Sequence, residues 1–376
     1  MSRRLITGFA IFLSIFSAIL FVSHRYLVER LAHAPAWGSP TEEILEVLIW
    51  FGAGIQVLLP FAIRSLPPSR ARLIAWPGYT WLGTAFYLLF FVAASDIVLW
   101  LLSANSIHVQ QIRAMSVVGA TAVLVTWGMV TALSIPGVKQ VQIALPRWPK
   151  ELSGYRIIQL SDIHIGAILQ RGYAERLVEL CNRLEPDLIA ITGDLVDGSL
   201  EHLQHHVAPF EALRARDGVF FVTGNHDHYA GASQWSNFLE ELGLRVLRNA
   251  HATVQARDSS FVVGGVYDRT SSNGDDVNAA FSGASSSTPR LLLAHHPQTF
   301  HKATQHQVDL QLSGHTHAGQ LWPFRYFVHL QTPFIDGLHW QGPHALYVSR
   351  GTGFWGPPMR ILAPPEVTEL ILVHGG

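Results

Sequence analysis

The chain has 376 residues, of which 49% are hydrophobic and 14% charged, and its formal net charge is −1 at pH 7. This composition argues against an ordinary soluble protein, and because the chain has no run of basic residues we expect no nucleic-acid partner. The hydrophobic excess lies almost entirely before residue 140, whereas the rest has the mixed composition of a globular domain. The sequence therefore predicts two physically different halves.

Four stretches of the first half are apolar enough to cross a bilayer, which requires about 20 residues. They are Leu5 to Val22, Ile44 to Ile63, Ile74 to Leu102 and Met115 to Val138. Basic residues precede the first stretch, as in a signal peptide, but no clear small-residue cleavage site follows it, so we expect a retained helix. Residues 1–138 are predicted to form an all-α transmembrane bundle of about four helices.

The orientation follows from the basic residues, because Lys and Arg are enriched in cytoplasmic connections. One side has Arg3, Arg4, Arg64, Arg70, Arg72, Lys139, Arg147 and Lys150, and the other has Arg25, Arg30 and Arg113. This bias predicts an integral protein of the bacterial inner or plasma membrane whose second half is cytoplasmic. The single cysteine, Cys181, cannot form an intramolecular disulfide, which is compatible with a reducing compartment.

Two acidic residues, Glu46 and Asp96, fall in or beside the predicted spans. An ionisable residue inside a membrane is a functional candidate, but two isolated carboxylates do not make an ion pathway. We therefore expect Glu46 to be interfacial and Asp96 to lie at a helix break or a contact within the bundle. After the last span, residues 139–153 are predicted to be a linker that holds the following domain, residues 154–376, close to the membrane.

The second half alternates short apolar runs with stretches typical of helices. This alternation predicts an α/β layered domain. The expected helices are Tyr173 to Leu184, Leu200 to Ala215 and Ser233 to Leu242. The expected strands are Tyr155 to Leu160, Asp187 to Thr192, Val219 to Thr223, Phe261 to Val266, Leu291 to Ala294 and Leu310 to Ser313.

Polar side chains follow most of these strands directly. Because the carboxyl ends of strands in open α/β sheets meet in one crevice, we expect these side chains to lie close together. Carboxylate, imidazole and amide oxygen suit Mn, Fe or Zn ions, and two such ions can hold a hydroxide and neutralise charge at phosphorus. The residues concerned are Asp162, His164, Asp194, Asn225, His226, Asp227, His295, His315 and His317.

Five short motifs, in their order along the chain, resemble the signature of calcineurin-like metallophosphoesterases. The residues in these motifs are similar to those of a bacterial branch of YkuE-like phosphodiesterases. The resemblance covers residues 154–376 and implies an α/β/β/α sandwich and a hydrolase activity. The motifs are Ser161-Asp162-Ile163-His164, Gly193-Asp194, Gly224-Asn225-His226-Asp227, Ala294-His295 and Gly314-His315-Thr316-His317. Their glycines permit tight backbone geometry where a side chain would obstruct the site.

The resemblance also implies individual roles around two divalent ions, Mn²⁺, Fe²⁺/Fe³⁺ or Zn²⁺. Asp194 would bridge the ions, and His226 would point at the phosphate, with Asp227 hydrogen-bonded to its other ring nitrogen. Of the adjacent His295 and His296 we prefer His295 as the ligand, because neighbours on a strand face opposite ways. The first ion would be held by Asp162, His164 and His317, and the second by Asn225, His295 and His315.

Other polar residues leave alternatives open. For Arg350 and Arg360 two roles are equally open: each could bind a phosphate or anchor a loop. His228 is expected to be a loop residue more than a substrate contact, and the stretch Ser271 to Ser287 an exposed excursion. His202, His205 and His206 share a predicted helix face that we expect to be solvated.

The predicted function is a membrane-anchored phosphoesterase that cleaves a phosphodiester or pyrophosphate bond with a hydroxide bridging two metal ions. Anchoring suggests a lipid or lipid-linked substrate, such as a molecule similar to UDP-diacylglucosamine. The alternative is a membrane sensor or scaffold that binds phosphorylated ligands without turnover. The paired His226 and Asp227 argue against this alternative, because binding alone requires no acid.

Overall fold

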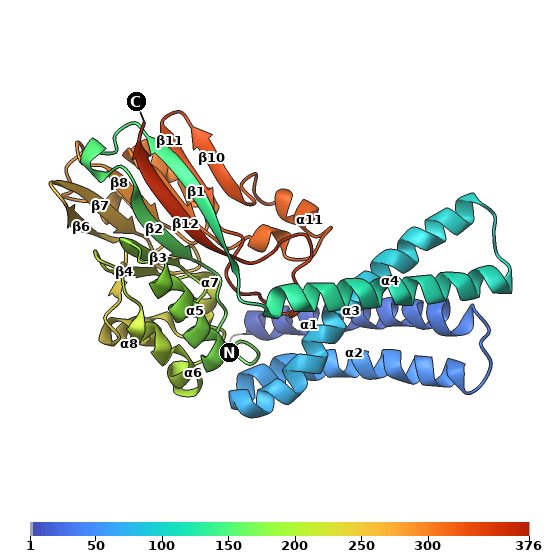
Figure 1. The fold of residues 1–376 in the computed structure, drawn as a ribbon. Coiled ribbons are helices and arrows are strands. Elements are labelled where there is room, and N and C mark those ends of the chain that lie inside the picture. Colours follow the sequence, from blue (N-terminus) through green and yellow to red (C-terminus); the bar gives the residue numbers. More distant parts are fainter. Residues whose placement is uncertain (1–2, 376) are drawn as a thin grey trace. The chain divides into compact units, whose positions relative to one another are not determined.

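The structure, a computed structural model, describes residues 3–375, with side chains from residue 14 onward. The chain divides into two compact units, Met1–Trp127 and Gly128–Gly376, which are described separately. The boundary falls inside helix α4, so the last turns of this helix belong to the C-terminal unit. Figure 1 follows the chain from the helical N-terminal unit to the mixed C-terminal unit.

The N-terminal unit is helical, as the sequence predicted. Helices α2, α3 and α4 are long and apolar enough to cross a membrane. The first predicted span lies within α1, but side chains before residue 14 lie outside the described part of the chain, so this span stays a prediction. The helices are α1 (Arg3–Val28), a π-helical turn (Glu29–His33), α2 (Thr41–Ser65), α3 (Pro68–Leu101) and α4 (Ile107–Leu133).

Asp96 lies at a polar contact within this helical unit, in agreement with the expectation of a bundle contact. Its carboxylate is 2.8 Å from Arg30 Nε and accepts a hydrogen bond of 2.6 Å from the Tyr26 hydroxyl. Arg113, whose side chain is only 3% exposed, donates to the same carboxylate at 2.5 Å. The carboxylate therefore compensates a buried guanidinium and ties α1, α3 and α4 together.

We expect Asp96→Ala to lower the stability of the protein in detergent by about 3–5 kcal/mol, because it leaves the buried Arg113 without its anion. Thermal unfolding followed by intrinsic fluorescence measures the effect. The matched control is Glu46→Ala, since the Glu46 side chain is 43% exposed and should matter little. Equal melting temperatures for the two variants would contradict the assignment of Asp96 as a structural anion.

The C-terminal unit contains two six-stranded sheets. The first has the order β1-β12-β2-β3-β4-β5 and the second β10-β11-β9-β8-β7-β6. The first consists of β1 (Gly137–Leu145), β12 (Glu366–His374), β2 (Tyr155–Leu160), β3 (Leu188–Thr192), β4 (Val219–Val222) and β5 (Arg245–Val246). The second consists of β10 (Gly337–Gln341), β11 (His344–Val348), β9 (Leu310–Ser313), β8 (Arg290–Leu293), β7 (Ser259–Gly265) and β6 (Ala250–Ala256).

Three apolar clusters show that the two sheets pack face to face with helices outside. Ile157 and Phe220 of the first sheet share a buried cluster with Phe261 and Leu310 of the second. The outer face of the first sheet is covered by α5 (Arg171–Arg183), α6 (Leu200–Val207) and α8 (Ala232–Glu241), and that of the second by α9 (Val277–Ala280) and α10 (Phe300–Ala303). The predicted α/β/β/α sandwich is confirmed.

The segment predicted as a linker, residues 139–153, is instead part of the sandwich. β1 pairs in parallel with β12 along its whole length, and Trp148, 1% exposed, packs on Tyr155 and Phe261. The alternation Val141, Ile143, Leu145 supplies an apolar face with period two, which is the reason the segment forms a strand. Only residues 134–136 separate α4 from β1.

Candidate metal centre

The predicted ligands follow parallel strands, as the sequence suggested. β2, β3 and β4 run parallel, so Asp162, Asp194 and Asn225 reach the same edge of the first sheet. In the second sheet β8 and β9 run parallel and bring His295 and His315 to a common edge. The two edges meet, because His295 Nε2 lies 3.2 Å from Asp194 Oδ2.

The first group of donor atoms comes from Asp162, His164 and His317. His317 Nε2 lies 3.3 Å from Asp162 Oδ1 and 3.1 Å from His164 Nε2. The Asp162 carboxylate also accepts the backbone N–H of His315 at 3.0 Å, which fixes its orientation. Two imidazole nitrogens and a carboxylate oxygen thus converge on one point.

The second group comes from Asp194, Asn225, His295 and His315. His295 Nε2 is 3.2 Å from both Asn225 Oδ1 and His315 Nδ1. The other ring nitrogen of His295 lies 2.8 Å from the Thr192 carbonyl, so we infer that it carries a proton and that Nε2 is the nitrogen available to a metal ion. His296 Nε2 lies 3.1 Å from Asp268, and His296 belongs to none of the groups of metal donors among the described residues.

Asp194 joins the two groups. Its Oδ2 is 3.2 Å from His295 Nε2 and 3.9 Å from His164 Nε2, and its Oδ1 accepts the backbone N–H of His226 at 2.8 Å. The donor atoms of Asp162, His164 and His317 lie within 4.8 Å of one another, as do those of Asp194, His295 and His315. One carboxylate between two sets of His and Asp donors is the arrangement that a pair of divalent ions requires.

The protonation states also suit metal binding. Burial holds the pKa of His315 and His317 well below the usual value, and the charges of neighbouring His295 and Arg360, respectively, act in the same direction. Both imidazoles are therefore neutral at pH 7, which is the state that binds a cation. Burial lowers the pKa of His295, but the charge of Asp194 outweighs this effect and raises the pKa to about 10, so a metal ion would displace a proton from this ring. The donor set itself fits two divalent metal ions.

Backbone strain is concentrated at the same residues. Only a small fraction of non-glycine residues adopt a positive φ, because their Cβ clashes with the backbone there. Such strain persists where the surrounding structure over-determines it, and it clusters at functional sites. The donors with a positive φ are Asp162 (53°), His164 (53°), Asp194 (52°), His315 (72°) and His317 (50°).

Two glycines let the motifs approach one another. A Cβ on Gly224 would lie 2.2 Å from Asp194 Oδ1, and a Cβ on Gly314 would lie 1.9 Å from Ser161 Oγ and 2.2 Å from Asp162 Oδ2. Any side chain there would displace a donor carboxylate. The close approach confirms the steric role predicted for these two glycines.

The predicted pairing of Asp227 with the His226 ring is wrong. The Asp227 carboxylate is buried and accepts four backbone N–H groups: Gly224 at 2.8 Å, Asp194 at 2.9 Å, Leu195 at 3.0 Å and Val196 at 3.2 Å. These bonds hold the turn after β3 against the start of α7 (Asn225–Ala230), as a carboxylate at the third position of a helix often does. Asp227 therefore organises the backbone of the site.

Asp197, which the sequence analysis missed, takes the place expected for Asp227. Its Oδ1 lies 2.8 Å from His226 Nδ1 and 2.9 Å from His164 Nδ1. Both Nδ1 atoms donate, so both Nε2 atoms face the site. Burial lowers the pKa of His226, but the hydrogen bond to Asp197 and its charge outweigh this effect and raise the pKa to about 9. His226 is thus an imidazolium at pH 7.

A second missed acid is Asp268, which lies 3.1 Å from His296 Nε2. The His296 ring stacks on His315, with 3.8 Å between ring centroids. Asp268 follows the end of β7 much as Asp162 follows β2. Its position just after a strand could therefore have identified Asp268 from the sequence. Asp197 gave a weaker signal, because it stands three residues after Asp194 in the same loop.

Of the two roles left open for Arg350 and Arg360, the structure favours the anchoring of loops. The fully buried Arg360 donates to the carbonyl oxygens of Gly353, His317 and Arg350 at 3.0, 2.9 and 2.7 Å. Arg350 Nε lies 3.0 Å from Asp336. Arg360 thereby fixes the backbone of His317, a candidate ligand.

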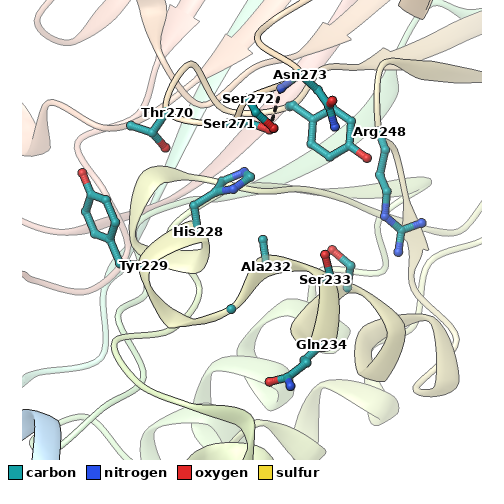
Figure 2. A pocket seen from close by; sticks show the side chains of 13 residues that line it. His228, Tyr229, Ala232, Ser233, Gln234, Arg248, Thr270, Ser271, Ser272 and Asn273 are labelled. Carbon is teal, nitrogen blue, oxygen red and sulfur yellow. Dashed lines mark hydrogen bonds between the residues drawn. The ribbon is translucent and has the colours of Figure 1, made fainter. Parts of the chain in front are cut away.

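His228 lines a polar pocket of about 490 Å³ beside the centre. Figure 2 shows His228 of α7 on one side and Ser271, Ser272 and Asn273 on the other. Tyr229, which lines the pocket, also contacts the His226 ring, with 5.6 Å between centroids. Arg248 is paired with Glu240 at 2.7 Å, so this arginine adds no uncompensated charge. The pocket offers room for a polar group next to His228.

The remaining histidines of the predicted helix face do not join the centre. His206 is buried rather than solvated, and its Nδ1 accepts the backbone N–H of Arg171 at 3.2 Å. The His205 ring stacks on it. Within the described residues, none of these side chains belongs to a group of metal donors.

The fold and the site define a metal-dependent phosphoesterase. Residues 155–319 match the family model described as calcineurin-like phosphoesterase. A bovine transmembrane protein with a metallophosphoesterase domain is 32% identical over 93% of this chain and 85% of its own length. The chain belongs to the calcineurin-like metallophosphoesterases, and three of its helices are long and apolar enough to cross a membrane.

Two further relatives agree with this family. A zebrafish transmembrane protein with metallophosphoesterase domain is 38% identical, and the match covers 67% of this chain and 61% of the zebrafish protein. The uncharacterized metallophosphoesterase YkuE of Bacillus subtilis is 32% identical over 60% of this chain and 81% of its own length. The chain thus spans somewhat less than two thirds of the zebrafish relative.

Proposed function

We propose that this protein hydrolyses a phosphodiester or pyrophosphate bond at a centre of two divalent metal ions, with Mn²⁺, Fe²⁺/Fe³⁺ and Zn²⁺ as candidates. The single observation that carries the proposal is the Asp194 carboxylate, which lies between two groups of His and Asp donors. Asp162, His164 and His317 would hold one ion, and Asn225, His295 and His315 the other. Bound ions would supply an activated water and neutralise charge at phosphorus.

His226 is not among the proposed ligands and would act on the substrate. Its Nδ1 proton is engaged by Asp197, so Nε2 is the nitrogen that can reach a phosphate oxygen. With a pKa of about 9, the ring carries a proton that it can donate to the leaving oxygen. We therefore assign His226 the role of general acid and Asp197 that of positioning it.

Membrane anchoring supports a lipid or lipid-linked phosphodiester as substrate, on the cytoplasmic face of a bacterial inner membrane. The polar pocket suits a headgroup rather than an acyl chain. We expect the detergent-solubilised enzyme to prefer long-chain phosphodiesters, and equal turnover of short-chain analogues would count against a lipid. The orientation is tested with a cysteine placed at Asp258. The extent of its labelling by an impermeant reagent is compared between intact and lysed cells.

Removal of metal tests the central proposal. We expect the purified protein to hydrolyse bis(p-nitrophenyl) phosphate with Mn²⁺, to lose this activity after chelation and to regain it when Mn²⁺ is added back. The matched variant is His226→Ala, which should keep its metal content but lose about 10²–10⁴-fold in kcat, because it lacks only the acid. Full activity in the metal-free protein would overturn the proposal, as would a metal-loaded protein that turns over no phosphoester.

A further inference from the structure

A short helix of the C-terminal unit presents large apolar side chains to the outside. We define the aromatic surface as Phe324, Tyr326, Phe327 and Leu330, which are 48%, 60%, 58% and 84% exposed. They lie on or beside α11 (Arg325–His329), whose other face packs through Val328 on Ala318, Ile335 and Ala363. A contiguous exposed apolar patch of this kind marks an interaction site.

The base of the aromatic surface is tied to the segment that holds the end of α4. Ile361 donates its backbone N–H to Gln320 at 2.9 Å and accepts that of Trp322 at 3.1 Å. The neighbouring Arg360 donates its backbone N–H to the carbonyl of Gly128, in α4, at 2.9 Å. The two-residue segment 360–361 therefore contacts both the residues just before the aromatic surface and the last turns of a helix that is apolar enough to cross a membrane.

The composition of this stretch fits a lipid interface. Residues 322–330 contain aromatic and basic side chains but no Asp or Glu, which is the character of segments at the headgroup level of a bilayer. Arg325 lies 3.2 Å from Asp336, outside the stretch, and stays 37% exposed. An anionic leaflet would attract such a segment, and burial of the rings among the headgroups would stabilise it.

We propose that the aromatic surface contacts the phospholipid bilayer in which the protein's own helices are embedded. A bilayer is the expected partner of this surface because α4 leads directly into the C-terminal unit. The segment 360–361 joins the last turns of α4 to the base of the aromatic surface. This contact with the bilayer does not depend on the proposed function.

The surface also leads toward the candidate centre. The Gln320 side chain donates to the Trp355 carbonyl at 2.8 Å and accepts the Trp355 backbone N–H at 3.1 Å. The Trp355 ring, 52% exposed, lies 5.6 Å from the His226 ring. A bilayer at the aromatic surface would bring headgroup phosphates toward His226, and this second step rests on the proposed function.

Fluorescence quenching in vesicles tests the contact. Full-length protein with Phe327→Cys is reconstituted in phosphatidylcholine and phosphatidylglycerol and labelled with an impermeant, environment-sensitive fluorophore; the native Cys181 is buried and stays unlabelled. The matched control is Asp258→Cys, in the exposed turn between β6 and β7. We expect nitroxide lipids to quench the label at 327 several-fold more than at 258, and aqueous iodide to do the reverse.

Two results would overturn the proposal. Equal iodide access at both positions would place the aromatic surface in water, and protection from both quenchers at 327 would mean that protein covers it. Tyr326→Cys repeats the measurement if the first variant melts below the wild type. Phe324→Ser/Phe327→Ser should lower turnover of a vesicle-borne phosphodiester but not of a soluble one; no turnover of either would contradict the proposed function and leave the quenching result intact.

Discussion

Asp194→Asn is expected to lower kcat for bis(p-nitrophenyl) phosphate by about 10³-fold or more. The Asp194 carboxylate lies within reach of donors of both groups. An amide has the same shape but carries no negative charge and offers one oxygen. The variant should therefore hold less than two metal ions per chain, as measured by elemental analysis.

The control for this substitution is Asp258→Asn, the same chemical change at an exposed turn far from the motifs in sequence. It should leave both kcat and metal content unchanged. An Asp194→Asn protein that binds two ions and retains more than about a tenth of the wild-type rate would show that Asp194 does not join the two groups.

Asp197→Asn is expected to lower both kcat and metal affinity, each by about 10–100-fold. The reason is that one carboxylate oxygen accepts from His164 and from His226. Loss of its charge disturbs a candidate ligand and the candidate acid together. His226→Ala, by comparison, should affect kcat alone, so kinetics combined with a manganese titration distinguish the two substitutions.

Asp227→Asn tests whether Asp227 holds the backbone of the site, as observed, or pairs with the His226 ring, as the family resemblance implied. An amide in this position turns an N–H₂ group toward backbone donors, which leaves buried groups unsatisfied and should cost about 1–3 kcal/mol of stability. If Asp227→Asn instead lowered kcat more than Asp197→Asn without changing the melting temperature, the pairing of His226 with Asp197 would be wrong.

The sequence predicted the strands and helices around the motifs well, because each parallel strand is a continuous apolar run followed by polar residues. The six predicted strands correspond to β2, β3, β4, β7, β8 and β9, and the three predicted helices to α5, to α6 with the turn after it, and to α8. These strands are buried on both faces, so their composition alone indicates them.

The strands that the sequence analysis missed lie mainly outside this central part. β1 at the edge of the first sheet alternates exposed and buried residues, and its position directly after a predicted membrane span favoured a linker. β5 has only two residues, and β10 is half exposed. Such strands depend on pairing partners far along the chain, which local composition does not reveal.

The candidate donors were predictable because their motifs carry the chemistry in consecutive residues. The partner of the His226 ring was not predictable in this way. Asp227 is adjacent in sequence but its side chain points into the turn after β3, whereas Asp197 reaches the ring from a different loop. Proximity in sequence is a poor guide where a helix start turns successive side chains in different directions.

The position of β12 has a consequence for biogenesis. This final strand lies between β1, which directly follows α4, and β2, which leads into the first metal motif. Until residues 366–374 have left the ribosome, β1 has no neighbour to pair with and stays separated from the other strands of the first sheet. The helices that precede β1 along the chain therefore leave the ribosome before the first sheet can be completed.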